Sequence, residues 1–170
     1  NCRTEDPVNL MTGSFSWEYR DLAIYGKNDL EFIRYYESSA ADEDYGLGPG
    51  WSSNYTCRLY TDTLYARVVL PRGVELYFDR DYDGAYRGAG DYTLDISTGR
   101  YVLRSKDGTS YLFNDSHLLV CIVYQNGNTV QLGYSGDRIS TVSNGSGTFT
   151  LTYKDGRLDR VSDSAGRGVS

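Results

Sequence analysis

The chain has 170 residues, a formal net charge of −6, and 17 tyrosines against only 5 phenylalanines. An acidic chain without a clustered basic stripe is not expected to bind nucleic acid, because neutralising phosphates requires concentrated Lys and Arg. No apolar run approaches the roughly 18 residues of a membrane span, and no window keeps the apolar spacing of an amphipathic helix. Tyrosine favours half-buried pleated surfaces. We therefore predict an all-β fold of consecutive antiparallel hairpins that form a curved, open sheet.

Strand and turn patterns follow one another along the chain. The first predicted strands are Asn9–Ala23 and Leu30–Glu37, separated by the turn 25–29 and followed by a long polar, acidic loop over 38–50. Further hairpin strands are predicted at Tyr65–Leu70, Val74–Asp79, Tyr92–Ile96 and Tyr101–Ser105. The segments 71–73 and 97–99 supply two of the turns. The apolar run Leu118–Tyr124 fits one buried strand.

The last third of the chain contains an internal repeat. The segment 129–147 aligns with 148–166 at an offset of 19 positions, so that Tyr134 falls on Tyr153 and Val142 on Val161. A third, weaker copy begins near Tyr111 and closes at the turn 126–128. Apolar and turn positions agree together, and such self-similarity indicates a repeat architecture.

Each repeat unit has the pattern of a hairpin. In the last copy an alternating strand ends at Tyr153, the turn contains Asp155 and Gly156, and Leu158 and Val161 begin the return strand. The odd separation of Leu158 and Val161 places them on opposite faces unless a bulge intervenes. Because a lone hairpin is marginally stable in water, each unit must lie against its neighbours.

We divide the chain into an opening block (1–58), a β-hairpin region (59–107) and the repeats (108–170), which form one continuous structural unit. At the end of the repeats, the last strand would present unpaired backbone groups. We therefore predict that the hairpin Thr148–Asp163 is either frayed or paired edge-to-edge with a second molecule.

The repeat Tyr153–Asp163, closed by Gly166 and Arg167, resembles the YD repeats of the Rhs family, which includes wall-associated proteins, toxin-complex C subunits and teneurins. The opening block is similar to the start of the Rhs shell in three segments, which are Asp6–Asn9 with Thr12 and Gly13, then Leu30–Ser38, then Leu47–Trp51. The resemblance implies a β-sheet that spirals into a hollow shell around a C-terminal toxic domain. The family's C-terminal core block, which self-cleaves in many members, has no counterpart in this sequence.

Several positions are expected to define this fold rather than to carry chemistry. They are Pro7, Gly13, Arg34, Tyr35, Gly48, Gly50 and Trp51 in the opening block, and Tyr134, Tyr153, Gly156, Leu158 and Val161 in the repeats. Arg34 is suited to a bidentate pair with a carboxylate within the sheet, although the sequence does not name its partner.

One segment has the beginning of a calcium loop. Asp79, Asp81 and Asp83 alternate before Gly84, and Ca²⁺ prefers several oxygen ligands around such a turn. The twelfth position of the loop would be Gly90, which cannot ligate. A solvated hairpin tip is therefore the favoured interpretation, and no metal or other cofactor is assigned.

The cysteines and the single histidine do not form a recognisable centre. Cys2, Cys57 and Cys121 lack metal-binding spacing, and Cys121 is expected to be a buried, inert thiol, although a Cys57–Cys121 disulfide remains open. His117 is expected to be an exposed turn residue. With one histidine, no Ser-His-Asp triad can form within this chain.

These observations lead to one functional expectation and two alternatives. The chain is expected to be a non-catalytic segment of an Rhs/YD-repeat shell in a secreted or surface protein, bacterial in origin, with an upstream segment before Asn1. Its partners would be the remaining shell and the C-terminal cargo domain of the same polypeptide. The first alternative is a carbohydrate-binding or adhesion module that uses exposed Tyr and Trp, including Trp17 and Trp51, with calcium as a stiffening ion. The second is a hydrolase with two unrecognised carboxylates.

Overall fold

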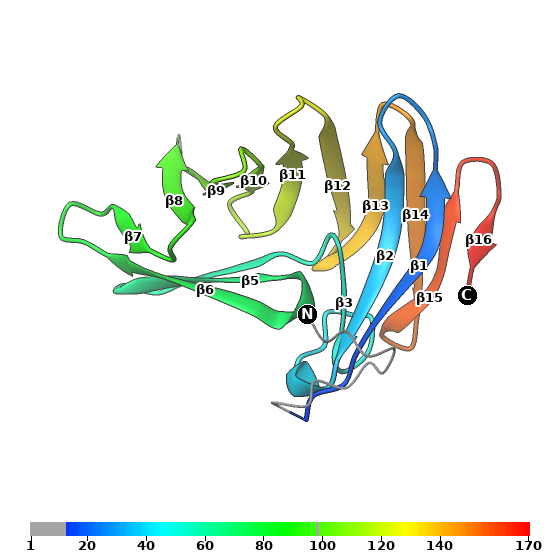
Figure 1. The fold of residues 1–170 in the computed structure, drawn as a ribbon, viewed down its shortest axis with the longest axis horizontal. Helices are drawn as coiled ribbons and strands as arrows, with labels where there is room; N and C mark the ends of the chain where they lie inside the picture. The colour runs from blue at the N-terminus through cyan, green and yellow to red at the C-terminus, as the bar shows by residue number, and fades with distance from the viewer. Residues whose placement is uncertain (1–12, 98) are drawn as a thin grey trace.

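The computed structural model describes residues 13–97 and 99–170, and in this part of the chain the regular structure is β-strand with two short 3₁₀ turns (Figure 1). The first elements are β1 (Ser16–Ile24), β2 (Leu30–Glu37), η1 (Ser38–Ala40), β3 (Trp51–Ser53), β4 (Arg58–Thr61), β5 (Tyr65–Leu70), η2 (Pro71–Gly73), β6 (Val74–Arg80) and β7 (Tyr86–Gly88). They are followed by β8 (Tyr92–Ser97), β9 (Arg100–Ser105), β10 (Ser110–Phe113), β11 (Leu119–Val123), β12 (Thr129–Ser135), β13 (Arg138–Asn144), β14 (Gly147–Lys154), β15 (Arg157–Asp163) and β16 (Gly168–Val169).

The largest sheet is a nine-stranded antiparallel meander, and we call it the repeat sheet. Its strands lie in the order β16 to β8, so every strand pairs with its neighbours in sequence. The strands form because apolar and polar residues alternate, as in β14, where Phe149 and Leu151 are buried and Thr150 and Thr152 are exposed. The predicted all-β fold of consecutive antiparallel hairpins in an open sheet is confirmed.

Two smaller sheets pack against the repeat sheet. The strands β1, β2 and β3 form a three-stranded ribbon, and β4 to β7 form a four-stranded sheet. The ribbon crosses over β13 and β14 (Figure 1), where the rings of Phe32 and Phe149 meet edge-on at 6.4 Å. The four-stranded sheet joins the repeat sheet through a bridge between Arg58 and Leu118. The three sheets therefore enclose one apolar core, whose largest buried members are Phe32, Phe78, Phe113, Phe149, Leu30, Leu94, Leu103 and Leu119.

A bulge recurs on the second strand of each of the last three hairpins. The extra residues are Val120 in β11, Ser140 in β13 and Asp159 in β15. Leu158 and Val161 are three positions apart and would lie on opposite faces of a regular strand. The extra residue Asp159 between them lets both side chains face the core. The period of the repeat thus includes one unpaired residue.

The acidic loop after β2 is held in place by the repeats. The Asp44 carboxylate accepts hydrogen bonds from the N–H groups of Gly46 (2.8 Å) and Gly48 (3.1 Å). The carbonyl of Gly46 in turn accepts a hydrogen bond from the N–H of Leu158 at 2.8 Å. The loop therefore connects the opening block to the last hairpin.

At the end of the chain, the expected fraying of the hairpin Thr148–Asp163 is wrong, while edge-to-edge pairing with a second molecule stays a prediction. The hairpin of β14 and β15 is well formed, and β16 pairs with β15 within the same molecule through Val161↔Val169 and Ser162↔Gly168. The turn that returns the chain is fixed by Asp163, whose carboxylate accepts hydrogen bonds from the N–H groups of Ala165 and Arg167, both at 2.9 Å.

Two further expectations need correction, and two fall outside the described residues. His117 is half-buried rather than exposed, because its ring packs edge-on against Tyr101 at 5.1 Å. Cys121 is half-exposed rather than buried, and Cys57 and Cys121 are both free thiols, so they form no disulfide with each other. Pro7 and Cys2 lie outside the described residues. In the described ranges, no helix has the length and hydropathy that a membrane crossing requires.

Candidate functional site

The residues expected to define the fold gather mainly along the seam between the ribbon, the acidic loop and the repeat sheet. The seam is therefore the candidate site, and its contacts join the opening block to the repeat sheet. Three groups of contacts make it up, which are an ion pair inside the ribbon, an arginine clamp outside it, and a series of tyrosine hydroxyl bonds along the repeats.

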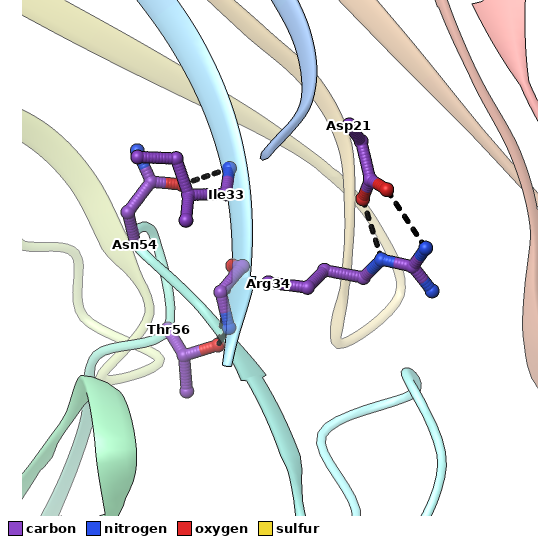
Figure 2. A network of polar contacts seen from close by, with 6 residues as sticks. Asp21, Ile33, Arg34, Asn54 and Thr56 are labelled. Atoms are coloured by element: carbon purple, nitrogen blue, oxygen red, sulfur yellow. Dashed lines mark hydrogen bonds and ion pairs between the residues drawn. The ribbon is translucent and has the colours of Figure 1, made fainter. Parts of the chain in front are cut away.

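The ion pair joins Arg34 to Asp21 (Figure 2). The Nε and Nη2 atoms of Arg34 donate hydrogen bonds to the two carboxylate oxygens of Asp21 at 2.5 and 2.8 Å. Asp21 is the extra residue of a bulge in β1, between Arg20 and Leu22, and the bulge redirects its side chain. The Asp21 side chain is 1% exposed and that of Arg34 is 27% exposed. The pair is thus a desolvated bidentate contact of the kind expected for Arg34, and Asp21 is the partner that the sequence did not identify.

Arg34 also connects β2 to β3. Its guanidinium lies 5.2 Å from the centre of the Trp51 ring, and the Trp51 ring contacts Tyr36 at 5.4 Å. A cation over an indole face is electrostatically favourable. Two of the predicted positions, Arg34 and Trp51, therefore meet directly.

The segment after β3 is fastened to β2 by side-chain hydrogen bonds. Figure 2 shows Asn54 beside Ile33, where the side-chain Oδ1 of Asn54 accepts a hydrogen bond from the Ile33 N–H at 3.1 Å. The Asn54 amide donates to the carbonyl of Glu31 at 3.0 Å, and the Tyr55 hydroxyl donates to the same carbonyl at 2.6 Å. The Thr56 hydroxyl oxygen accepts the N–H of Ser53 at 2.8 Å. These bonds fix the direction in which the chain leaves the ribbon towards β4.

Glycines allow the loop before Trp51 to approach the ribbon. Gly50 has φ +77°, and a Cβ there would lie 2.9 Å from the ring of Tyr36 and 3.0 Å from the carbonyl of Glu37. Gly48 also adopts a positive φ, next to the Trp51 ring. Gly13 has a positive φ too, but no atom lies within 4 Å of a Cβ placed there, so a close approach does not require glycine at that position.

The arginine clamp is formed by Arg72 and was not anticipated from the sequence. Arg72 lies in η2 with φ +65°, and its guanidinium is 4.2 Å from the centre of the Tyr35 ring. The same group forms an ion pair with Glu18 and approaches Glu37 at 3.9 Å. Burial raises the pKa of Glu37, and Arg72 opposes that rise. Arg72 thus holds the β5–β6 turn against the outer face of the ribbon.

The pKa of Tyr35 reflects the same surroundings. Burial raises the pKa of the phenol, the Glu18 carboxylate raises it further, and the Arg72 guanidinium opposes both effects. A raised pKa keeps the phenol neutral at physiological pH. Tyr35 therefore serves as an uncharged ring on which Arg72 packs.

The tyrosine hydroxyls of the repeats make equivalent hydrogen bonds. The Tyr134 hydroxyl donates to the carbonyl of Leu119, and the Tyr153 hydroxyl donates to the carbonyl of Ile139, each at 2.8 Å. Each acceptor immediately precedes a bulge residue on the neighbouring strand. Burial raises the pKa of both phenols, that of Tyr153 to about 12. The two repeat tyrosines therefore connect each hairpin to the one before it.

The turn of the last repeat adopts the expected backbone. Asp155 and Gly156 both have positive φ, at +50° and +85°, as a two-residue hairpin turn requires. A Cβ on Gly156 would lie 3.4 Å from the Arg138 guanidinium, which also packs 5.5 Å from the Tyr153 ring. Gly156 thus combines a turn with a close contact to the preceding unit.

The calcium candidates do not converge. Arg87 forms ion pairs with both Asp81 and Asp83, the second at 3.6 Å, while Asp79 pairs with Arg87 and Tyr65 through the β-ladder. No group of three His, Cys, Asp or Glu side chains suited to a metal ion occurs within residues 13–97 and 99–170. The segment is a hairpin tip in which Arg87 pairs with two of the three carboxylates.

A family model, described as a domain of unknown function (DUF6531), matches residues 5–78. The matched region includes the ribbon, the acidic loop and the arginine clamp, and it ends at Phe78 within β6. The chain is thus similar to this family over the part that supplies Asp21, Arg34 and Arg72. No curated protein matches the chain.

Proposed function

We propose that this chain is a non-catalytic structural segment of an Rhs/YD-repeat shell that encloses a C-terminal domain, expected to be toxic, of a larger secreted or surface protein of bacterial origin. The observation that carries the proposal is the recurrence of one connection, in which a tyrosine hydroxyl binds the carbonyl that precedes a bulge of the previous hairpin. A connection repeated at equivalent positions suits a sheet that grows one hairpin at a time.

The two faces of the repeat sheet support a role as a wall. One face is covered by the ribbon and the four-stranded sheet, with Leu132, Val142 and Phe149 buried beneath them. The opposite face carries polar residues in cross-strand rows, such as Thr141, Thr150 and Ser162. A wall of this kind presents hydroxyl groups on one side and is fastened by the opening block on the other. No residue of the chain is assigned a catalytic role.

Limited proteolysis of the parent polypeptide tests the proposal. We expect a protease-resistant C-terminal domain in the wild-type polypeptide, and faster cleavage when Arg34→Met breaks the buried ion pair with Asp21. The control is Tyr25→Phe, because Tyr25 is 70% exposed and lies in a surface turn. A polypeptide in which no domain downstream of this segment is protected would refute encapsulation.

A groove beside the ribbon favours carbohydrate binding as the second candidate function. The groove has a volume of about 520 Å³ and lies between the turn 25–29 and the β11–β12 turn. Its lining includes Lys27, Tyr124 and Asn128, whose side-chain polar atoms make no hydrogen bond within the described ranges. Free amide and phenol groups in a pocket of this size suit a polyhydroxylated ligand. Trp17 and Trp51 do not line this groove.

A glycan array separates the two candidates. For a shell segment, we expect no glycan to bind the purified chain. Binding that disappears in Asn128→Ala, while Tyr25→Phe retains it, would favour the carbohydrate-binding alternative.

A further inference from the structure

A polar cavity at the seam is lined by two arginines that have no carboxylate partner in the described part of the chain. The cavity has a volume of about 250 Å³ and lies between the acidic loop, the start of β4, and the turns before β13 and β15. We propose that it binds a tetrahedral oxyanion of the phosphate or sulfate type, held between Arg58 and Arg138. Such a site would exist whether or not the parent polypeptide encloses a domain.

The two guanidinium groups come from segments far apart in the sequence. Arg58 begins β4, and its Nη2 donates a hydrogen bond to the backbone carbonyl of Asp137 at 2.7 Å. Arg138 begins β13, and its guanidinium lies 5.5 Å from the centre of the Tyr153 ring. Burial raises the pKa of Tyr153 to about 12, and Arg138 and Arg58 both oppose that rise. Both cations therefore lie near the same phenol and beside the same cavity.

Most N–H donors of the two arginines are unused. A guanidinium carries five N–H donors, of which Arg58 uses one and Arg138 uses none within residues 13–97 and 99–170. Both side chains are partly buried, and neither forms an ion pair in those ranges. Two like charges beside one cavity repel each other, so an anion between them would offset an unfavourable interaction. The planar fork of a guanidinium matches the oxygens of phosphate and sulfate.

The acidic groups beside the cavity do not take the place of such an anion. One oxygen of Asp44 accepts the N–H groups of Gly46 and Gly48, so this carboxylate is engaged within its own loop. The side chain of Asp137 is exposed and pairs with neither guanidinium in the described ranges. It leaves both cations without a counterion and adds one repulsive charge at the rim.

Tyr45 contributes a neutral part of the wall. Burial raises the pKa of its phenol to about 12, so the group is protonated at physiological pH and adds no negative charge. The Tyr45 hydroxyl is buried, and it has no hydrogen-bond partner among the described residues. The wall thus consists of cationic and neutral groups apart from the two carboxylates.

An anion at this position would join two parts of the chain. Arg58 belongs to the opening block, whereas Arg138 belongs to the repeats. Gly46 of the acidic loop and Gly156 of the last repeat turn also line the cavity, and Cβ atoms placed on them would lie 3.5 and 3.4 Å from the Arg138 guanidinium. A ligand that contacts both arginines therefore bridges the seam, and it stabilises the native state.

The test measures the binding of inorganic phosphate to the chain by isothermal titration calorimetry at fixed ionic strength, because salt screens charge pairs. We expect one phosphate to bind with a dissociation constant in the millimolar range or tighter. Arg58→Gln and Arg138→Gln each remove one cation, and we expect each to weaken binding by about tenfold or more. The matched control is Arg157→Gln, because Arg157 holds the position of Arg138 in the next repeat but is exposed and does not line the cavity.

Asp137→Asn changes the affinity in the opposite direction. Removal of this carboxylate takes away a repulsive charge, so we expect phosphate to bind about threefold more tightly. A gain in affinity cannot arise from a loss of folding, and the melting temperature of every variant in chloride alone verifies that it is folded. Equal dissociation constants for Arg138→Gln and Arg157→Gln would overturn the site.

A second ligand distinguishes the source of the oxyanion. Glycerol phosphate carries the same group on a larger molecule. Tighter binding of glycerol phosphate than of inorganic phosphate would assign the site to a phosphate ester, and equal or weaker binding would assign it to the free ion. Absence of binding by both ligands at millimolar concentration would refute the oxyanion site, and it would leave the outcome of the proteolysis test unaffected.

Discussion

Asp21 and Arg34 share two hydrogen bonds but differ greatly in exposure, since the carboxylate is 1% exposed and the guanidinium side chain is 27% exposed. The asymmetry matters because removing one member of a buried pair leaves the other charge without compensation. The charge that would be left buried by loss of Arg34 is the Asp21 carboxylate. The charge left by loss of Asp21 would reach water more easily.

We therefore expect Arg34→Met to lower the free energy of unfolding by about 3–5 kcal/mol, and Asp21→Asn to lower it by less. The double variant Asp21→Leu/Arg34→Met should recover most of the loss, because it removes both charges and leaves apolar side chains. Urea unfolding of the three variants measures these differences. Equal losses for the two single variants would contradict the inference that the Asp21 carboxylate is the charge more costly to leave unpaired.

The repeat tyrosines provide a second prediction. Tyr134→Phe and Tyr153→Phe each remove a hydroxyl that donates to a backbone carbonyl at 2.8 Å and leave the ring in place. We expect each substitution to lower the free energy of unfolding by about 1 kcal/mol. Tyr25→Phe, at a 70% exposed position, serves as the control and should have no measurable effect. Losses no larger than that of the control would show that the hydroxyl bonds do not support the sheet.

Stability at low pH should depend on Asp163. Burial would raise the pKa of this carboxyl, but hydrogen bonds from the Arg167 guanidinium and from the N–H groups of Arg167 and Ala165 hold it below its usual range. A depressed folded-state pKa adds stability above the unfolded pKa of about 3.9, and that stability is lost as pH falls through the folded-state pKa. In Asp163→Asn, we expect a flatter dependence of the urea midpoint on pH below about 4. The exposed Asp159 on the same strand provides the control variant, Asp159→Asn, and an unchanged pH dependence in Asp163→Asn would refute the prediction.

The two described cysteines should differ in reactivity. Cys57 is 3% exposed, and burial raises its pKa well above the usual range, whereas Cys121 is half-exposed with a pKa that burial also raises. Because the thiolate is the reactive form, we expect a maleimide to label Cys121 slowly in the native protein and Cys57 only after unfolding. Peptide mapping by mass spectrometry identifies the labelled residue. Labelling of Cys57 at the native rate of Cys121 would show that the core opens locally.

Calcium should leave the protein unchanged. Arg87 already forms ion pairs with Asp81 and Asp83, so the hairpin tip offers no free set of three carboxylates. We expect millimolar Ca²⁺ to leave the melting temperature unchanged, since a ligand of the native state would raise it. A rise that disappears in Asp81→Ala would establish a calcium site.

Much of the strand pattern could be predicted because it is local. The predicted strands Leu30–Glu37 and Tyr65–Leu70 coincide with β2 and β5, and the alternation in the last repeat coincides with β14 and β15. The bulges were also within reach of the sequence. In β1, Trp17 and Tyr19 have odd numbers, whereas Leu22 and Ile24 have even numbers. These four side chains can lie on the same face of the strand only if one extra residue stands between Tyr19 and Leu22.

The contacts between distant segments could not be predicted in the same way. Arg72 reaches Tyr35, Glu18 and Glu37 only because the β5–β6 turn packs on the ribbon, and no local pattern encodes that docking. Fraying of the last hairpin was expected because the pairing of β16 depends on the turn at Asp163, a position whose importance appears only when β15 is in place. Local periodicity therefore determines the strands, and long-range contacts determine how the sheets are joined.

The extra residues at Val120, Ser140 and Asp159 have a geometric consequence for any longer array. Each bulge bends its strand and increases the local right-handed twist. The three bulges lie on equivalent strands, so each unit bends and twists at the same place. Repeating one such step generates a helical coil whose radius and pitch are set by a single unit. Additional units would lengthen this coil, while its bore would stay constant.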